Sequence, residues 1–173
     1  MFNWFSKPAA IPAGPVEWIA VGLGNPGRDY ENTRHNAGFC AVERIAGKCG
    51  VKIDRLKFKS LCADTTFGGQ RVLLMKPSTF MNCSGEAVRE AMQFYKIPAE
   101  RVLVLFDDVS LDPGRLRIRR QGSDGGHNGI KNMIYLTGKD TFPRIKIGVG
   151  KKPHPGYDLA AWVLGKFPKE LAD

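Results

Sequence analysis

The stretch VGLGNPGRDYENTRHNAG, residues 21–38, is where a predicted strand ends and polar residues precede a predicted helix. Residues 16–21 form a mainly apolar run that predicts the strand, and three glycines with Pro26 predict a tight turn after it. Beyond Gly38, apolar residues recur at helical spacing as far as Cys49. Because ligands of open α/β sheets bind outside the carboxyl ends of the strands, this stretch predicts a functional site.

The rest of the chain continues an alternation of strands and helices that predicts an α/β domain. Alternating residues around Gly68-Gly69 predict a hairpin, and the uninterrupted apolar residues 102–106 predict a central strand. The predicted strands are 16–21, 60–67, 71–76, 102–106, 115–119 and 144–149, and the predicted helices are 36–49, 84–95, 130–136 and 158–164. We expect a flexible N-terminal arm at 1–15 and a single domain at 16–173, with a twisted, mixed, mostly parallel sheet flanked by helices on both faces.

The composition argues against a membrane protein and favours a cytoplasmic one. No apolar run approaches the ~20 residues of a membrane-spanning helix, and residues 1–15 lack the apolar core of a signal peptide. The four cysteines form no C-x-x-C pair and have no metal-ligand spacing with the three histidines. We therefore expect reduced thiols, a cytoplasmic location and no metal ion.

Basic residues exceed acidic residues by 26 − 17 = 9, which favours a partner that carries phosphates, although a solvated basic surface remains an alternative. Ten basic and only two acidic residues lie between residues 115 and 152. Period-two alternation predicts that Leu116 and Ile118 face the core, as do Ile145 and Ile147, with basic residues on the outward faces. The outward residues predicted to contact phosphates are Arg117, Arg119, Arg144 and Lys146.

The glycines of the opening stretch match the dinucleotide-binding pattern G-x-G-x-x-G, at Gly22, Gly24 and Gly27. In that fold a helix must begin at the glycines, so that its N-terminus faces the pyrophosphate. Here the polar residues 28–35 delay the helix. The nucleotide-binding interpretation, with Asp54 as the ribose ligand, is therefore the less favoured one.

His35 and Asp107 are the candidates for acid–base chemistry. Asp107 ends the predicted central strand, from which its carboxylate could reach a histidine beside the first strand. A carboxylate that accepts one ring N–H fixes the tautomer and leaves the other nitrogen able to take a proton. The alternative is a helix-start histidine and a turn aspartate. Since the G-x-S-x-G nucleophile motif is absent, a hydrolase here would use water activated by histidine.

Three asparagines are placed where donors to an oxyanion would be needed. Asn25, Asn82 and Asn128 all fall in predicted turns or at helix starts. One such donor can be worth ~3 kcal/mol in the transition state. Each asparagine alone is equally explained as a turn or cap residue.

Five blocks in one order resemble the bacterial-type peptidyl-tRNA hydrolase family, over about residues 16–167. They are GLGNPG at 22–27 with Tyr30, TRHNAG at 33–38, KPSTFMNCSG at 76–85, DD at 107–108 with PG at 113–114, and GGHNG at 125–129. The resemblance implies a metal-free, cofactor-free, monomeric esterase. Its substrate would be the ester between a stalled peptide and the 3′ ribose of tRNA, and its product a recycled tRNA.

The resemblance also implies roles for individual residues. By motif, His35 corresponds to the catalytic base and Asp107 to the carboxylate that orients it. Asn25 and Asn82 would hold the peptide end and the 3′ terminus, with Asn82 also near the oxyanion, and Asn128 would position the water.

Four further residues take roles from the same resemblance. Tyr30 and Met81 would line the pocket. Arg119 and Lys146 fall where the family has basic residues that hold tRNA phosphate, and a lysine there would act as a point charge without a bidentate fork.

Two features depart from the family pattern, and one rival interpretation remains. Asp124 puts a negative charge into the glycine-rich loop, and the family usually continues beyond the position of Asp173 into a further C-terminal helix. The rival is a non-catalytic RNA-binding protein on the same scaffold. The presence of His35, Asp107 and the three asparagines argues against it.

Overall fold

The computed structural model describes residues 13–171, so residues 1–12 of the predicted arm lie outside the described residues. The chain folds around a seven-stranded sheet with the order β2-β3-β4-β1-β5-β7-β6. The strands are β1 Trp18–Gly22, β2 Arg55–Lys57, β3 Ser60–Phe67, β4 Gln70–Pro77, β5 Val102–Asp108, β6 Leu116–Arg119 and β7 Arg144–Gly148. The α-helices are α1 Ala37–Lys48, α2 Ser84–Tyr95, α3 Asn128–Thr137 and α4 Leu159–Leu164. Within residues 13–171 no helix is long and apolar enough to cross a membrane.

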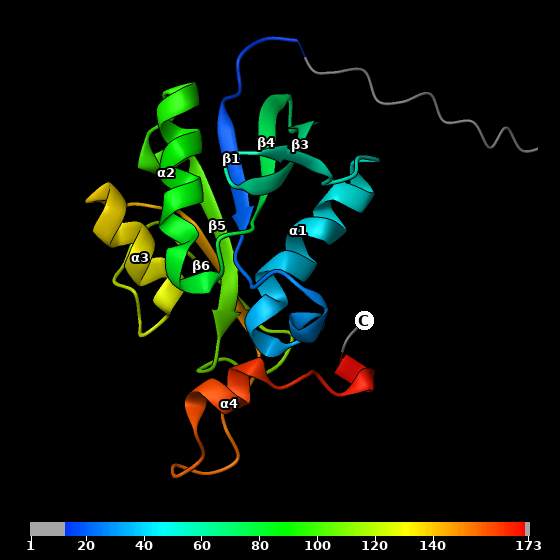
Figure 1. Cartoon of the computed structure of the whole chain (residues 1–173), viewed down its shortest axis with the longest axis vertical. Coiled ribbons are helices and arrows are strands. Elements are labelled where there is room, and N and C mark those ends of the chain that lie inside the picture. Colours follow the sequence, from blue (N-terminus) through cyan, green and yellow to red (C-terminus); the bar gives the residue numbers. More distant parts are fainter. Residues whose placement is uncertain (1–12, 172–173) are drawn as a thin grey trace, which may run out of the picture.

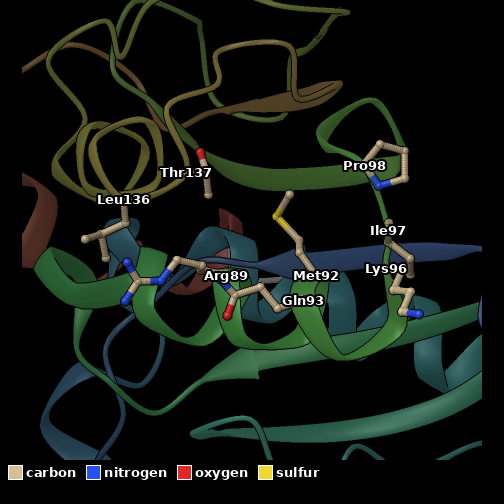
Figure 2. A pocket seen from close by; sticks show the side chains of 8 residues that line it. All are labelled: Arg89, Met92, Gln93, Lys96, Ile97, Pro98, Leu136 and Thr137. Carbon is tan, nitrogen blue, oxygen red and sulfur yellow. The ribbon is translucent and has the colours of Figure 1, made fainter.

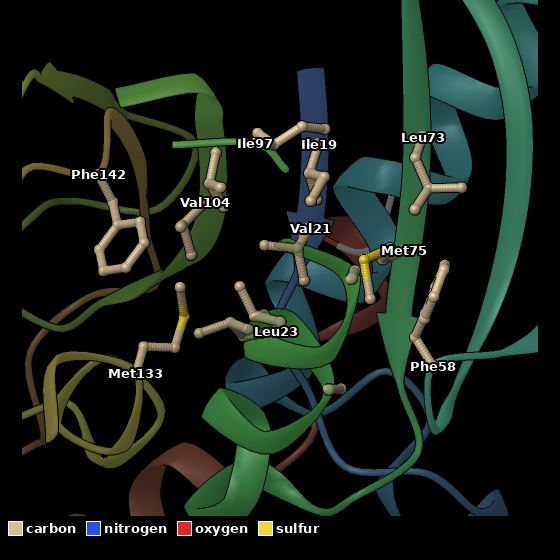
Figure 3. Packing of buried hydrophobic residues seen from close by; sticks show 14 of the residues in the cluster. Ile19, Val21, Leu23, Phe58, Leu73, Met75, Ile97, Val104, Met133 and Phe142 are labelled. Atoms are coloured by element: carbon tan, nitrogen blue, oxygen red, sulfur yellow. The ribbon is translucent and has the colours of Figure 1, made fainter. Parts of the chain in front are cut away.

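The sheet lies between two helical layers, with α1 on one face and α2 and α3 on the other (Figure 1). Under α2 and α3, Met133 packs in one buried cluster with Val21 and Val104 of the sheet (Figure 3). On the opposite face, Val42 of α1 belongs to a smaller cluster with Leu74 of β4. Full burial of one such side chain contributes ~1.5–3 kcal/mol, so these clusters hold the layers together.

Parallel pairing at the centre of the sheet brings the ends of β1 and β5 together. Strand β1 pairs in parallel with β4 and with β5, where Val21 lies opposite Val104, and β5 pairs in parallel with β7. Antiparallel pairs form the two margins, β2–β3–β4 on one side and β6–β7 on the other. The predicted mixed sheet with helices on both faces is confirmed, but within residues 13–171 three strand pairs are parallel and three antiparallel, so the sheet is not mostly parallel. Both central strands end at the pole of the molecule that carries α4 (Figure 1).

Gly22 and Gly38 allow α1 to approach the ends of the central strands closely. A Cβ atom on Gly22 would lie 2.1 Å from the carbonyl oxygen of Gly38, and one on Gly38 would lie 2.3 Å from that of Leu105. Helix α1 begins only at Ala37, well after Gly27. These glycines therefore serve helix–sheet packing, and the dinucleotide interpretation fails because only the short 3-10 turn Arg28–Tyr30, and no α-helix, begins directly after Gly27.

The prediction that Leu116 and Ile118 face the core is wrong. Their exposed fractions are 65% and 68%. Strand β6 is the edge strand of the sheet, and its main packing partner is β7. The alternation of apolar and basic residues correctly indicates two different faces of this strand. The apolar face is exposed, however, because no helix or strand covers it within residues 13–171.

The prediction that Arg144 points outward to solvent is also wrong, because this residue is 1% exposed. Its guanidinium donates to the carbonyl oxygens of Phe142, Ser123 and Asp140, at 3.1, 3.0 and 2.8 Å. A guanidinium has five N–H donors in a rigid fork, which suits it to joining several carbonyl groups. Arg144 thus ties the loops around residues 123 and 140 to the start of β7.

Candidate active site

The side chains of His35 and Asp107 meet at the carboxyl ends of β1 and β5. Atom Nδ1 of His35 lies 2.8 and 3.0 Å from the two carboxylate oxygens of Asp107. His35 comes from η2, the single 3-10 turn Arg34–Asn36 that leads into α1. The side chains are 13% and 2% exposed, respectively. The predicted contact is therefore present, and Nε2 of His35 has no hydrogen-bond partner among residues 13–171.

His127 is the second partner of the Asp107 carboxylate. Its Nε2 lies 2.8 Å from Oδ1 of Asp107, and its Nδ1 accepts the backbone N–H of Ile130 in the first turn of α3, at 3.4 Å. Because Nδ1 accepts, a neutral His127 carries its proton on Nε2 and donates it to Asp107. The carboxylate therefore accepts N–H groups from two imidazoles, one on each oxygen.

The two imidazoles keep Asp107 ionised although it is deeply buried. Burial alone would raise the pKa of this carboxyl, but the attraction of His127 and the hydrogen bonds from His127 and His35 outweigh it and lower the pKa from 3.8 to about 2. With Asp107 negative, Nδ1 of His35 must be the protonated nitrogen, since it faces an acceptor. The lone pair on Nε2 is then free to accept a proton.

His35, Asp107 and His127 also qualify as a group of possible metal ligands, with one donor atom each within 4.8 Å of one another. Their closest N···O distances of 2.8 Å are those of N–H···O hydrogen bonds. Two ligands of a tetrahedral zinc ion, with bonds of ~2.0–2.1 Å, would lie roughly 3.3 Å apart. A metal ion would have to replace both hydrogen bonds, so we retain the metal-free site as a prediction.

Asn25 is held in place by Asn36, which hydrogen-bonds its backbone on both sides. The backbone N–H of Asn25 donates to Oδ1 of Asn36 at 2.8 Å, and Nδ2 of Asn36 donates to the carbonyl oxygen of Asn25 at 2.9 Å. Oδ1 of Asn25 in turn accepts the backbone N–H of Met81 at 2.7 Å. This bond fixes the orientation of the Asn25 amide, and its Nδ2 donors have no partner among residues 13–171, so they can bind a substrate.

Asn82 and Asn128 present exposed side-chain amides without a partner among residues 13–171. Asn82 lies in η3, the 3-10 turn Met81–Cys83, which packs against α3, where Asn128 is the first residue. Gly129 makes this approach possible, because a Cβ there would lie 2.7 Å from Sδ of Met81 and 3.1 Å from Cε1 of His127. The two amides are thus attached to the elements that adjoin the His127–Asp107 pair.

Only one of the two residues predicted to line the pocket has an accessible side chain. Tyr30 is half-buried and meets the exposed ring of Phe80 edge-on, with the ring centroids 6.2 Å apart. Met81 is 2% exposed and belongs to the core cluster under α2 and α3. Its side chain therefore offers a substrate little surface, and its place in the lining of the pocket stays a prediction.

Two cavities lie at opposite ends of the fold. One of about 250 Å³ adjoins the site and is lined by Asn25, Asn36, Phe39 and Lys76, among others. The other, of about 400 Å³, lies between α2 and α3 near Pro98, where β5 has not yet begun (Figure 2). Because β5 carries Asp107 at its opposite end, the smaller of these two cavities is the one placed to receive part of a substrate bound at Asn25.

Three of the four basic residues predicted to contact phosphate are accessible. Arg117 and Arg119 are exposed on β6, and Arg117 lies opposite Lys146 of β7 in the sheet register. Lys146 lies 3.9 Å from a carboxylate oxygen of Asp108, a distance at which this partly exposed pair is weak. The fourth residue, Arg144, is the buried one described above.

Asp124 shapes the glycine-rich loop. Its carboxylate accepts the backbone N–H of Gly126 at 2.7 Å, and its carbonyl oxygen accepts that of His127 at 3.0 Å. This is an Asx-type turn, which aspartate favours. The negative charge that departs from the family pattern thus helps to direct His127 toward Asp107.

The sequence analysis missed the parts played by His127 and Asn36. Both belong to recognised motifs, but neither was assigned a role. The sequence contains part of the information on these two residues. A histidine directly before a helix can cap it, and an asparagine in a turn can hydrogen-bond to backbone groups. The sequence could not reveal which strand end they would face.

Comparison with known proteins places the chain among sequences of one family. The sequence model of the family described as peptidyl-tRNA hydrolase matches residues 19–173. The chain is 53% identical to the peptidyl-tRNA hydrolase of Thermoanaerobacter sp. (strain X514) over 159 residues, which are 90% of this chain and 85% of that protein. It is 55% identical to that of Lachnoclostridium phytofermentans over 153 residues, which are 88% and 80% of the two chains.

Solved structures agree with the sequence comparison. The crystal structure of peptidyl-tRNA hydrolase from Acinetobacter baumannii superposes with a TM-score of 0.83 at 35% identity, covering 92% of this chain and 81% of that one. A peptidyl-tRNA hydrolase in complex with N-propanol gives a TM-score of 0.82 at 38% identity, over 89% and 78% of the two chains. The chain described here belongs to the bacterial peptidyl-tRNA hydrolase family and is a hydrolase of peptidyl-tRNA.

Proposed function

We propose that the enzyme cleaves the ester between the peptide and the 3′ ribose of tRNA with a water molecule activated by His35. One observation carries the proposal: Asp107 holds Nδ1 of His35 at 2.8 Å, and Nε2 is left without a partner within residues 13–171. A histidine fixed in this tautomer is a general base, and general-base catalysis typically contributes ~10²–10⁴-fold.

In the proposed reaction, Nε2 of His35 takes a proton from water while the water oxygen attacks the ester carbonyl. The tetrahedral intermediate collapses by releasing the 3′ oxygen of the ribose, which takes the proton back from the imidazolium. The ionised Asp107 stabilises that imidazolium, as the carboxylate does in the Ser-His-Asp mechanism.

The amides of Asn25, Asn82 and Asn128 are proposed to hold the substrate around this step. The bond from Met81 fixes the orientation of the Asn25 amide and leaves its N–H donors unpaired, so we assign them to a carbonyl oxygen of the peptide. Asn82 is assigned to the developing oxyanion and the 3′ terminus, and Asn128 to the attacking water. A single donor to an oxyanion can be worth ~3 kcal/mol.

We propose that Arg117, Arg119 and Lys146 contact phosphates of the acceptor stem, while the 3′ CCA end enters the site. Charged residues on β6 and β7 lie in the same sheet as Asp107, since β7 is the direct neighbour of β5. A monomer is proposed as well, because all the residues assigned here come from one chain. A cytoplasmic location is proposed because the four cysteines are free thiols.

The test is release of an N-acetylated amino acid from tRNA in the presence and absence of a strong chelator. We expect hydrolysis of N-acetylaminoacyl-tRNA and equal rates in both conditions, because the proposed mechanism has no metal ion. A binding protein without activity would show affinity for the tRNA but no release. Loss of activity in the chelator, restored by one metal, would show that the His35–Asp107–His127 group binds that metal.

A further inference from the structure

The segment that follows β7 returns to the catalytic histidine and packs on its neighbour, Arg34. The guanidinium carbon of Arg34 lies 3.5 Å from the centroid of the Trp162 ring in α4, and its Nη1 donates to the carbonyl oxygen of Trp162 at 3.3 Å. The backbone N–H of Arg34 donates to the carbonyl oxygen of Gly165 at 3.0 Å. Arg34 is only 9% exposed, and no carboxylate pairs with it among residues 13–171. We call this contact the Arg34–Trp162 stack.

Trp162 is itself fixed to the strand end that carries the catalytic carboxylate. Its indole Nε1 donates to the carbonyl oxygen of Gly150 at 2.9 Å. The preceding residue, Val149, donates its backbone N–H to the carbonyl oxygen of Asp108 at 3.1 Å, and Asp108 directly follows Asp107. A continuous series of contacts thus runs from β5 through Trp162 to Arg34. Helix α4 lies at the pole where β1 and β5 end (Figure 1).

The backbone on both sides of the stack is paired as well. Thr33 and Lys166 form an isolated antiparallel bridge, and the backbone N–H of Phe167 donates to the carbonyl oxygen of Asn32 at 2.9 Å. The fit around the guanidinium is close, because a Cβ on Gly165 would lie 2.9 Å from Nη1 of Arg34. The position of residues 32–34 is therefore set by a segment more than 120 residues further along the chain.

We propose that Arg34 and Trp162 are positioning residues, which hold η2 where Nδ1 of His35 meets Asp107. The proposal rests on the role of His35 as the base. A single 3-10 turn has little hydrogen bonding of its own, so its placement depends on outside contacts. Displacement of a catalytic group by ~1 Å can cost as much as ~10²-fold in rate. The stack itself is a cation–π contact, which is strongest where it is desolvated.

A direct role for Arg34 in holding tRNA phosphate is the competing explanation. It predicts a raised KM with an unchanged kcat. The burial of Arg34 under Trp162 argues against it, because phosphate contacts need an accessible guanidinium. A positioning role for Arg34 predicts instead a lowered kcat with little change in KM.

The experiment compares Trp162→Leu, Trp162→Phe and Arg34→Met with the parent, and uses Leu164→Ala as the control. Leu164 belongs to the same helix, is 42% exposed and has no part in the contacts described above. Three quantities are measured for each: kcat and KM on N-acetylaminoacyl-tRNA, the melting temperature, and the NMR resonance of the His35 Nδ1 proton bonded to Asp107. That resonance reports the hydrogen bond whether or not His35 is the base.

We expect Trp162→Leu and Arg34→Met to lower kcat by about ten- to a hundredfold, with KM changed less than about twofold. The Nδ1 proton resonance should broaden or disappear in both variants. Trp162→Phe keeps an aromatic face for Arg34 and should recover most of kcat and of the resonance, and Leu164→Ala should match the parent in all three measurements.

The proposal is overturned if Trp162→Leu keeps both kcat and the resonance, or if Trp162→Phe and Trp162→Leu are equally impaired at a temperature where both are folded. It is also overturned if the loss lies in KM alone. If His35→Ala proves fully active, the proposed general base is wrong, yet the NMR measurement still decides whether the stack positions the imidazole.

Discussion

The carboxyl end of β5 and the β6–β7 margin of the same sheet both carry charged residues, but they hold them in opposite ways. At the end of β5, Asp107 is 2% exposed on its side chain and bonded to His35 and His127. On β6, Arg117 and Arg119 are exposed, and the Arg119 guanidinium donates to the adjacent carbonyl oxygen of Ile118, at 3.0 Å.

The difference matches two kinds of chemistry. Proton transfer needs a base whose direction is fixed before the substrate arrives. Binding of a polyanion gains most of its free energy from the release of counterions, for which charges must stay accessible. A phosphate contact positions the nucleic acid without needing an exact orientation. Substitutions in the two regions should therefore change different quantities.

The largest effect is expected for His35→Ala. Removal of the proposed base should lower kcat at least ~100-fold, while the melting temperature stays close to that of the parent. The measurement is release of N-acetylated amino acid from tRNA under single-turnover conditions. A loss below about tenfold with an intact fold would remove His35 from the mechanism.

Asp107→Asn should approach the His35→Ala loss, because an amide can donate to Nδ1 and so favour the wrong tautomer of His35. Asp108→Asn is the matched control at the next position. The carboxylate of Asp108 turns the other way and accepts the backbone N–H and hydroxyl of Ser110, at 2.7 and 2.6 Å. Asp108→Asn should change kcat by less than about threefold, well below the ~10²-fold scale of a general base. Equal losses from the two variants would mean that the carboxylate has been misassigned.

Arg144→Met tests the one basic residue of the margin that is buried. It would leave three carbonyl groups without their donor, so the free energy of unfolding should fall by about 1–3 kcal/mol in urea titrations. Affinity for tRNA should change little as long as the protein is folded. An unaltered stability together with a raised KM would return Arg144 to the phosphate-binding surface.

Acid should destabilise the fold through Asp107. The pKa of this carboxyl is about 2 in the folded protein, below the ~3.9 of an unfolded chain. Its ionised form therefore stabilises the fold above about pH 4, and this contribution of about 2–3 kcal/mol is lost as the pH falls toward 2. In Asp107→Asn, the free energy of unfolding should depend less on pH in that window. Identical pH profiles for the variant and the parent would contradict the assigned pKa.

The smallest effect is expected for Arg119→Met. Loss of one accessible phosphate contact should raise KM for tRNA substrates several-fold and reduce the slope of log affinity against log salt by about 0.7–0.9. The free energy of unfolding should change by no more than about 0.5 kcal/mol. A minimal substrate with only the 3′ adenosine should be cleaved at the parental rate. If that substrate is affected equally, Arg119 serves the site or the fold.

The sequence correctly predicted the strands and helices whose apolar residues contact the core. The predicted bounds of the hairpin of β3 and β4, of helix α2 and of the buried strand β5 agree with the structure to within about two residues. Their apolar patterns are clear because these residues pack in the core. The approach of His35 to Asp107 was also foreseen. It follows from the parallel pairing of β1 and β5, whose ends must lie side by side.

The errors arise where alternation is present but the surroundings are unknown. Leu116 and Ile118 alternate like core residues, yet an edge strand can lack a covering layer. Arg144 alternates like a surface residue, yet neighbouring loops fold over it. The role of His127 is not evident from the sequence, because its direction depends on the conformation of a glycine-rich loop, which has no periodic signature.

The double attachment of Asp107 has a consequence for the energetics of the proposed catalytic cycle. When His35 gains a proton, its new positive charge appears next to a carboxylate that His127 already holds from the other side, at 2.8 Å. The carboxylate need not rotate, because both of its oxygens already face imidazole N–H groups and its side chain is only 2% exposed. The reorganisation that a solvated ion pair would undergo at each turnover has already occurred during folding, so the barrier to proton transfer carries little of that cost.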